Sequence, residues 1–396
     1  MRAMMVLAAI GLATMVPAEV MGQAQVMVTS SSGPIAGSPR TLSRERVERM
    51  SEAVGLDDVQ LEIALELFKE VEAKRQALSD ALREAMEDAR ELREDGDFTK
   101  MMARVKEVSA KHQEAVNQLE QTYLQDLQAM LLPEQQEAWP KAERIYRRGQ
   151  HMGSLMRSQA RVDVDELVRT EFATAYERED VAEVLERWAV QVDSLLVERV
   201  RKAEDIGGGP GFQGGVFMID GEDHFKPLRD IDGRIASAGE QAVRTLSGVL
   251  EEDAIEAAWL RRAFARVYRQ TDGERRLEAA LKIEDLTTDQ REQLDAVAGQ
   301  HERDAESARD RWVQAEKQRE EDDTMPPGVV VMIEGQEPSP SELARKAVDE
   351  LDERLEAKLE AILTPEQLAT LPETSSSDDS MRFAPATGSQ SIRIGG

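Results

Sequence analysis

The chain has 396 residues, with 78 acidic against 50 basic side chains and a net charge of −28 at pH 7. This acidic balance disfavours a nucleic-acid-binding protein, whose domains are normally basic. Charged residues make up 32% of the chain and aromatic residues only 4%, a composition typical of long exposed helices that bury thin apolar seams.

The first residues predict a targeting segment. Arg2 precedes a short apolar run, and Gly22-Gln23-Ala24 is a small-x-small cleavage site, so we predict a signal peptide over residues 1–24 that is cleaved after Ala24. We therefore expect a periplasmic or secreted protein of a Gram-negative type of bacterium. No later apolar stretch has the length of a membrane span. The chain has no Cys, so packing rather than disulfides must stabilise it.

The segment after the cleavage site is rich in Ser, Gly and Pro, and we predict a flexible linker over residues 25–52. From Leu56 apolar residues recur at spacings near 3 and 4, which predicts a long helix that ends at a turn near residues 95–97. A second long helix returns from about Met101. We predict that the two form an antiparallel hairpin within a first unit, residues 53–150.

Two further hairpin units are predicted, over residues 158–275 and 280–372. Short β-branched and apolar runs at 216–219 and 330–333 end at an acidic residue and Gly, which predicts a β-strand at the tip of each hairpin. The tail, residues 373–396, is rich in Ser, Asp and Gly, and we expect disorder there. The predicted fold class is all-α: tandem long antiparallel helical hairpins, with short strands at the tips of the second and third.

Four predicted helix starts share one motif, whose fullest form is Leu-Thr-x-x-Gln. A Thr or Asp accepts the first free amides of the helix, and the Gln three residues later reaches back to close a capping box. The two best copies begin at Leu286 and Leu363, and weaker copies begin at Leu56 and Leu131. The Gln residues are 75 apart in the first unit and 77 apart in the third, which indicates an internal repeat.

No motif predicts an enzyme or a cofactor site. The four His residues have no metal-ligand spacing, and we interpret His112 and His301 as seam or surface residues rather than ligands. The segment Asp230–Gly233 resembles a fragment of a calcium loop but lacks the bidentate Glu, so a helix start with an Asp cap is the preferred interpretation. The glycines between 207 and 215 precede no Gly-Lys-Ser/Thr and predict a flexible link.

Two stripes combine basic and aromatic residues, and their similarity supports the repeat. They are candidate partner-binding sites for anionic partners, or for acidic arms of the same chain. In the alternative interpretation, the cations complement helix dipoles while the aromatic rings pack between units. The stripe residues are Trp139, Arg144, Tyr146 and Arg147 in the first, and Trp259, Arg262, Arg266 and Tyr268 in the second.

The predicted tip strands are the other candidate sites. Exposed, they would offer a sheet edge to a partner, whereas pairing with each other would hide edges that invite aggregation. The residues concerned are Val216, Phe217, Met218, Ile219, Val331, Met332 and Ile333.

The signal peptide, the helical hairpins and the motif residues Leu286, Thr287 and Gln290, repeated at 363–367, resemble the Spy/CpxP family of periplasmic proteins. That resemblance implies a helical protein that binds other proteins in a chaperone-like, envelope-stress role. This chain differs from the family in its length and in its strongly acidic charge.

From these observations we expect a non-enzymatic periplasmic or secreted protein that binds other proteins, which include unfolded or envelope proteins. The alternative is a structural or adaptor protein of the cell envelope that uses its arms as coiled-coil spacers. We also consider a cation-buffering protein that holds many calcium ions weakly. We expect neither nucleic-acid binding nor a membrane span, and a homo-oligomer is compatible with the pattern.

Overall fold

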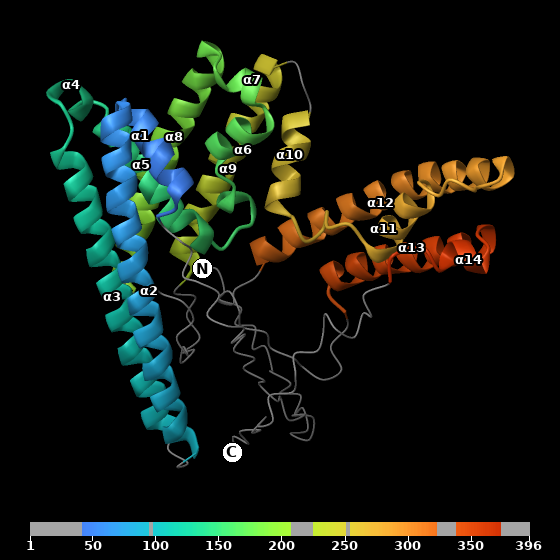
Figure 1. The fold of residues 1–396 in the computed structure, drawn as a ribbon, viewed down its shortest axis with the longest axis horizontal. Helices are drawn as coiled ribbons and strands as arrows, with labels where there is room; N and C mark the ends of the chain where they lie inside the picture. The colour runs from blue at the N-terminus through green and yellow to red at the C-terminus, as the bar shows by residue number, and fades with distance from the viewer. Residues whose placement is uncertain (1–41, 95–97, 207–224, 251–253, 323–337, 374–396) are drawn as a thin grey trace, which may run out of the picture.

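The computed structural model describes residues 42–94, 98–206, 225–250, 254–322 and 338–373, and each regular element within these ranges is a helix (Figure 1). The fold is therefore all-α. The predicted signal peptide, both predicted tip strands and residues 374–396 lie outside the described residues.

The helices in chain order are α1 (Arg44–Val54), α2 (Asp58–Glu94), α3 (Phe98–Ala129), α4 (Pro133–Gln136), α5 (Trp139–His151), α6 (Val164–Glu171), α7 (Ala173–Tyr176), α8 (Glu179–Asp205), α9 (Lys226–Leu250), α10 (Ala254–Ala263), α11 (Asp272–Ala280), α12 (Thr288–Asp322), α13 (Pro340–Ile362) and α14 (Pro365–Leu368). Two 3₁₀ turns, η1 (Met152–Ser154) and η2 (Gln159–Arg161), connect α5 to α6.

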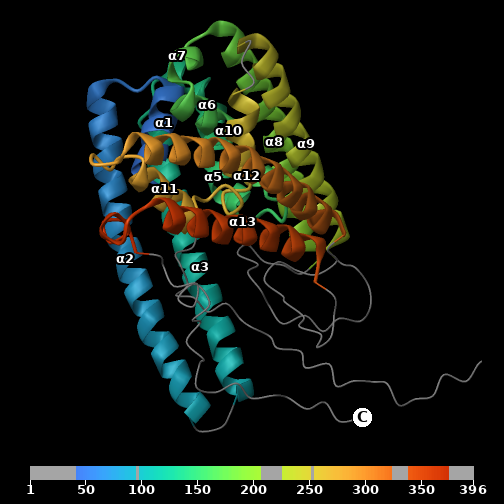
Figure 2. The same cartoon turned by 90° about the vertical axis from the view of Figure 1, so that its right-hand side faces the viewer.

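Three pairs of long helices dominate the packing: α2 with α3, α8 with α9, and α12 with α13. The members of each pair lie side by side, and the far half of the α2–α3 pair stands clear of the other described helices (Figures 1 and 2). Each pair contributes buried apolar residues to a cluster of its own, with Leu127, Leu196 and Leu359 fully buried in the three clusters. The core is thus divided along the chain.

The helix-start motif forms the predicted capping boxes. The Thr364 Oγ1 accepts from the Gln367 amide at 3.3 Å, and the Gln367 Oε1 accepts from the Thr364 amide at 3.0 Å. Thr287 and Gln290 make the same reciprocal contacts. Of the two weaker copies, Asp57 and Gln60 also make both contacts, whereas Leu132 has no side-chain acceptor, so only its amide donates to Gln135.

Each motif glutamine also meets a second motif glutamine across its pair. The Gln60 Nε2 lies 3.0 Å from the Gln135 Oε1, and the Gln290 Nε2 donates to the Gln367 Oε1 at 2.9 Å. The Gln60 and Gln290 amides also reach the carbonyls of Met130 and Ile362, at 3.2 and 2.9 Å. A glutamine clasp therefore closes the ends of the first and third pairs, which explains the similar motif spacing.

The clasp gives a measurable coupling. Gln60→Ala and Gln135→Ala are each expected to lower the free energy of unfolding by about 1–2 kcal/mol, because each removes hydrogen bonds from partly buried groups. The double variant should lose about 1 kcal/mol less than the sum, since the bond between the amides is lost only once. Urea unfolding of the four proteins measures this coupling, and strict additivity would show that the clasp contributes nothing.

One prediction is wrong: residues 44–52 do not belong to a linker. They form most of α1, which begins at the Ser43 cap and ends at Gly55 with a left-handed φ of 70°. Val47 and Met50 are fully buried in the first cluster. The helix was missed because its few apolar residues lie among charged ones, and only packing against α5 and α2 buries them.

Two further boundaries differ from the predictions. We placed residues 272–275 in the second unit, but α11 packs on α13, and the Gly273 amide donates to the Asp352 carboxylate at 3.1 Å. Asp232 was interpreted as part of a helix start, whereas α9 begins at Lys226, so Asp232 lies inside the helix. It is fully buried and accepts from the Arg199 Nε at 2.7 Å.

Candidate interaction surfaces

The first basic-aromatic stripe lies on α5, between the α2–α3 pair and the α8–α9 pair. Trp139 and Tyr146 are buried in the first cluster. The Trp139 Nε1 donates to Glu143 at 3.0 Å, and the Tyr146 hydroxyl donates to the buried Glu120 of α3 at 2.9 Å. Burial, which outweighs the nearby arginines, raises the pKa of the Glu120 carboxyl. These rings are thus part of the core.

The arginines of this stripe cross to carboxylates of α8. The Arg144 Nη2 lies 2.5 Å from the Glu186 Oε1. Arg147 binds both carboxylate oxygens of Asp193, with N–O distances of 2.7 and 3.0 Å. Of the alternatives left open by the sequence, the acidic arms of the same chain therefore hold Arg144 and Arg147.

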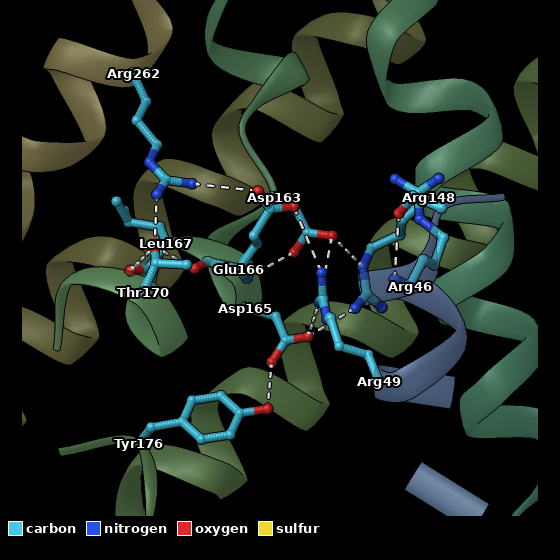
Figure 3. A network of polar contacts seen from close by, with 11 residues as sticks. Arg46, Arg49, Arg148, Asp163, Asp165, Glu166, Leu167, Thr170, Tyr176 and Arg262 are labelled. Atoms are coloured by element: carbon cyan, nitrogen blue, oxygen red, sulfur yellow. Dashed lines mark hydrogen bonds and ion pairs between the residues drawn. The ribbon is translucent and has the colours of Figure 1, made fainter. Parts of the chain in front are cut away.

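Beside the stripe lies a network that joins α1 and α5 to α6 (Figure 3). The Arg148 Nε and Nη2 each lie 3.0 Å from a carboxylate, of Asp163 and Asp165 respectively. The Arg49 Nη2 lies 2.5 Å from the same Asp165. Both guanidiniums are buried, with side chains 2% and 4% exposed. The Tyr176 hydroxyl completes the network with a 3.0 Å bond to Asp165.

Electrostatics favours this ionised arrangement. Burial alone would raise the pKa of the Asp163 carboxyl, but Arg148 and Arg49 outweigh it and hold that pKa below its usual value. The Arg148 guanidinium also lies 5.2 Å from the ring centre of Trp188 on α8, within range of a cation–π contact. We call the contact of α1 and α5 with α6 and α8 the first joint.

The central residues of the first joint were not among the residues predicted from the sequence. Asp163 caps α6 by accepting from the Glu166 amide at 3.2 Å, and the Asp-x-x-Glu pattern was a signal for that helix start. Arg49 was hidden in the supposed linker. The Ser43 cap, the apolar residues at 47, 50 and 54, and Gly55 were the signals for its helix.

The second stripe divides between several environments. Trp259 is buried in the second cluster, and the Arg262 Nε donates to Glu171 of α6 at 2.9 Å. Helix α10 ends at Ala263, so Arg266 and Tyr268 lie in the turns that follow. Arg266 is exposed, and Tyr268 is half-buried. The structure therefore does not bring these four side chains together as one stripe.

These turns belong to an apolar contact with the third pair, which we call the second joint. Its buried residues come from the turns after α10 and from α12 and α13, and they are Phe264, Val267, Ala308, Trp312, Val313 and Val348. Nearby, the Ser158 amide and hydroxyl donate to the Glu320 carboxylate of α12 at 3.1 and 2.5 Å. The two joints thus rely on different chemistry, ion pairs in the first and apolar contact in the second.

The remaining candidate features are weaker. Within the described ranges, no group of three His, Cys, Asp or Glu residues has the arrangement of metal ligands. His301 is nearly buried and lies 3.4 Å from the Glu274 carboxylate. An open groove of about 680 Å³ lies between α8 and α9, where residues such as Gln191 and Arg234 give it a polar lining.

Two observations concern the chain as a whole. None of the described helices combines the length and apolar character that crossing a membrane requires. In comparisons with protein-family models, curated proteins and solved structures, the chain matches none.

Proposed function

We propose that this chain is a non-enzymatic periplasmic or secreted protein that binds other proteins through tandem helical hairpins, in a chaperone-like role. The observation that carries the proposal is the projecting α2–α3 pair, whose far half stands clear of the other described helices (Figures 1 and 2). In that half Leu78, Leu82, Met86, Met101 and Val105 are only half-buried, because each helix has a single neighbour. Such a seam can accept the apolar face of a partner.

Other features support a duplicated hairpin module. A short helix that precedes each long pair begins at a side-chain cap: α1 at Ser43, α6 at Asp163 and α11 at Thr271, with α7 standing between α6 and the second pair. Across the first and third pairs the same glutamine clasp recurs. A placement outside the cytoplasm rests on the predicted cleavage after Ala24, and the Leu-Thr-x-x-Gln helix starts support the resemblance to the Spy/CpxP family.

Shortening the projecting pair tests the proposal. Deleting residues 79–92 together with 100–113 removes about four helical turns from each arm and keeps the seam in register. The mature chain, residues 25–396, is expected to suppress aggregation of a chemically unfolded client protein, and the shortened chain should lose most of that effect. Light scattering during client aggregation measures both.

As a control, the stability of the shortened chain is compared with that of the mature chain. The two should agree, because the deletion leaves the buried clusters around the clasp and the joints intact. Helix content per residue and the urea midpoint of the shortened chain should match those of the mature chain. If the mature chain has no effect on aggregation at several-fold excess, the chaperone-like role is excluded.

The second candidate is a structural or adaptor protein of the cell envelope, and the buried ion pairs of the first joint favour it. The buried guanidinium of Arg148, which binds two different carboxylates, fixes the angle between neighbouring helix pairs. A rigid shape in small-angle scattering together with no client binding would support this role. A compact ensemble of variable shape would exclude it.

A further inference from the structure

The contact between α5 and α8 is a ladder of charged side chains. Arg144 pairs with Glu186. Arg147, about one turn further along α5, pairs with Asp193, about two turns further along α8. His151 is the last residue of α5, four positions after Arg147, so it lies on the same helix face one turn further on. The ladder therefore continues to His151.

Near His151, the charged residue of α8 is the cation Arg199, whereas the first two contacts use carboxylates of α8. Arg199 follows Asp193 by six residues, and its Nε lies 2.7 Å from the buried Asp232 of α9. Its Nη2 donates to the Ser154 carbonyl, in the turn directly after His151, at 3.2 Å. Arg199 is thus fixed beside the end of α5.

His151 is half-buried, and the charges close enough to act on its imidazole are Arg199 and Asp193 on α8 and Arg147 on its own helix. Both ends of the Asp193 carboxylate already bind Arg147. Asp232 on α9 is bound by Arg199 and by the Met156 amide, at 2.7 Å each. From η1, the Ser154 hydroxyl donates to the His151 carbonyl rather than to the ring.

The other charged groups of the first joint are bound elsewhere. Arg148 of α5 binds Asp163 and Asp165, and Arg49 of α1 binds Asp165 and Glu166. On α1, Arg46 packs against Gly149. The carboxylates around the end of α5 therefore already have cationic partners, whereas the imidazole lies within electrostatic range of two guanidiniums, those of Arg199 and Arg147.

We propose that His151 makes the first joint proton-sensitive: when its ring takes up a proton, a third positive charge stands with Arg147 and Arg199, and α5 loosens from α8. The inference concerns regulation of the joint and does not depend on which protein the α2–α3 pair binds.

The direction of the effect follows from linkage. Burial, Arg199 and Arg147 lower the pKa of His151 in the closed joint to about 4, against 6.5 for an unperturbed imidazole. The proton is therefore bound more tightly when the joint is open. The joint is most stable above pH 6.5 and loses stability as the pH falls from 6.5 to 4, with a rise of roughly 100-fold in the opening constant.

The first test measures the pKa of His151 directly. The chain has four His residues, so selective labelling gives four imidazole NMR signals, and His151→Gln assigns the one of interest. We expect this signal to titrate near pH 4 in the mature chain, and to titrate closer to 6.5 in Arg199→Gln. A pKa near 6.5 in the unsubstituted protein would overturn the proposal.

The second test measures how often the first joint opens at each pH. Native-state hydrogen exchange, corrected for the intrinsic rate at each pH, should show protection of α5 amides falling by roughly 100-fold between pH 7 and 4. His151→Gln should remove most of this fall, and the matched control His112→Gln, on α3, should retain it. Equal pH dependence in all three proteins would overturn the proposal, because the carboxylates alone would then account for it.

A distance measurement keeps the test independent of stability. Since the chain has no Cys, Gln121→Cys on α3 and Ala182→Cys on α8 introduce two unique and exposed spin-label sites across the joint. Their distance distribution should broaden between pH 7 and 4 in the otherwise unsubstituted chain and stay unchanged with His151→Gln. A distribution that is identical at both pH values would contradict the proposal.

Discussion

Arg148→Ala is expected to lower the free energy of unfolding by about 3–5 kcal/mol, one of the two largest single-residue effects we expect. The guanidinium is 2% exposed and binds Asp163 and Asp165, so its removal strands carboxylates in a buried site. It also removes the ring contact with Trp188. Breaking one partner of a buried ion network costs more than the network itself contributes, because the remaining charge has lost its water. Urea unfolding measures the change without adding salt.

The matched control is Arg44→Ala on α1. Arg44 also pairs with a carboxylate, of Glu48 at 2.9 Å, but its side chain is 73% exposed. Exposed pairs contribute little, so a change within about 0.5 kcal/mol is expected. Similar losses for the two variants would show that burial of the Arg148 network has no special importance.

The pH dependence of the free energy of unfolding of Arg148→Ala is a second measurement. Asp163 has a lowered pKa in the folded state, so its ion pairs stabilise the protein above the unfolded-state pKa and lose that contribution as the pH falls through the folded-state value. In Arg148→Ala the main opposing charge is gone, so the loss of stability on acidification should begin at a higher pH. An unchanged profile would indicate that Arg49 alone holds Asp163 ionised.

Trp312→Ala is expected to produce a loss of similar size, about 3–5 kcal/mol, at the second joint. Trp312 on α12 is 6% exposed and belongs to the cluster with Phe264, Val267 and Val348. Truncation removes a large apolar surface and leaves a cavity between the turns after α10 and the third pair. It also removes the donor of the 3.1 Å bond to Glu316.

The location of the loss distinguishes this prediction from general destabilisation. Hydrogen-exchange protection should fall in α12 and α13 and stay nearly unchanged in α2 and α3, because the buried clusters of the two pairs are separate. The control is Leu343→Ala on α13, whose side chain is 54% exposed, and its effect should stay within about 0.5 kcal/mol. A uniform fall of protection across both pairs would show that the joints do not divide the protein energetically.

The features that sequence predicted best are local ones. The capping boxes at Thr287 and Thr364 depend on residues three apart, so their contacts follow from a few consecutive side chains. The all-α fold class was predicted in the same way, from the composition and from the spacing of apolar residues. In contrast, α1 was missed, because Val47 and Met50 count as core residues only when α5 and α2 cover them.

For the two basic-aromatic stripes, too, local features were predicted from the sequence and long-range contacts were not. Sequence identified Arg144 and Arg147 as a cationic group beside aromatic residues, and left open whether a partner or the chain itself would neutralise them. Their carboxylate partners, Glu186 and Asp193, lie about forty residues away, and nothing local selects them from 78 acidic residues. The second stripe looked equivalent in sequence, but α10 ends before Arg266 and divides it.

By itself, then, the sequence determined that this protein is a strongly acidic set of long helices and that several helices begin at a side-chain cap, because caps, period and composition act within a few residues along the chain. The tertiary structure decided which pairs of charges become buried, such as Arg148 with Asp163 and Asp165, and which glutamines meet across a helix pair. The physical reason is that the energy of a charge or an amide depends on its burial and its partner. Both are set by contacts between segments far apart in sequence, which no local pattern encodes.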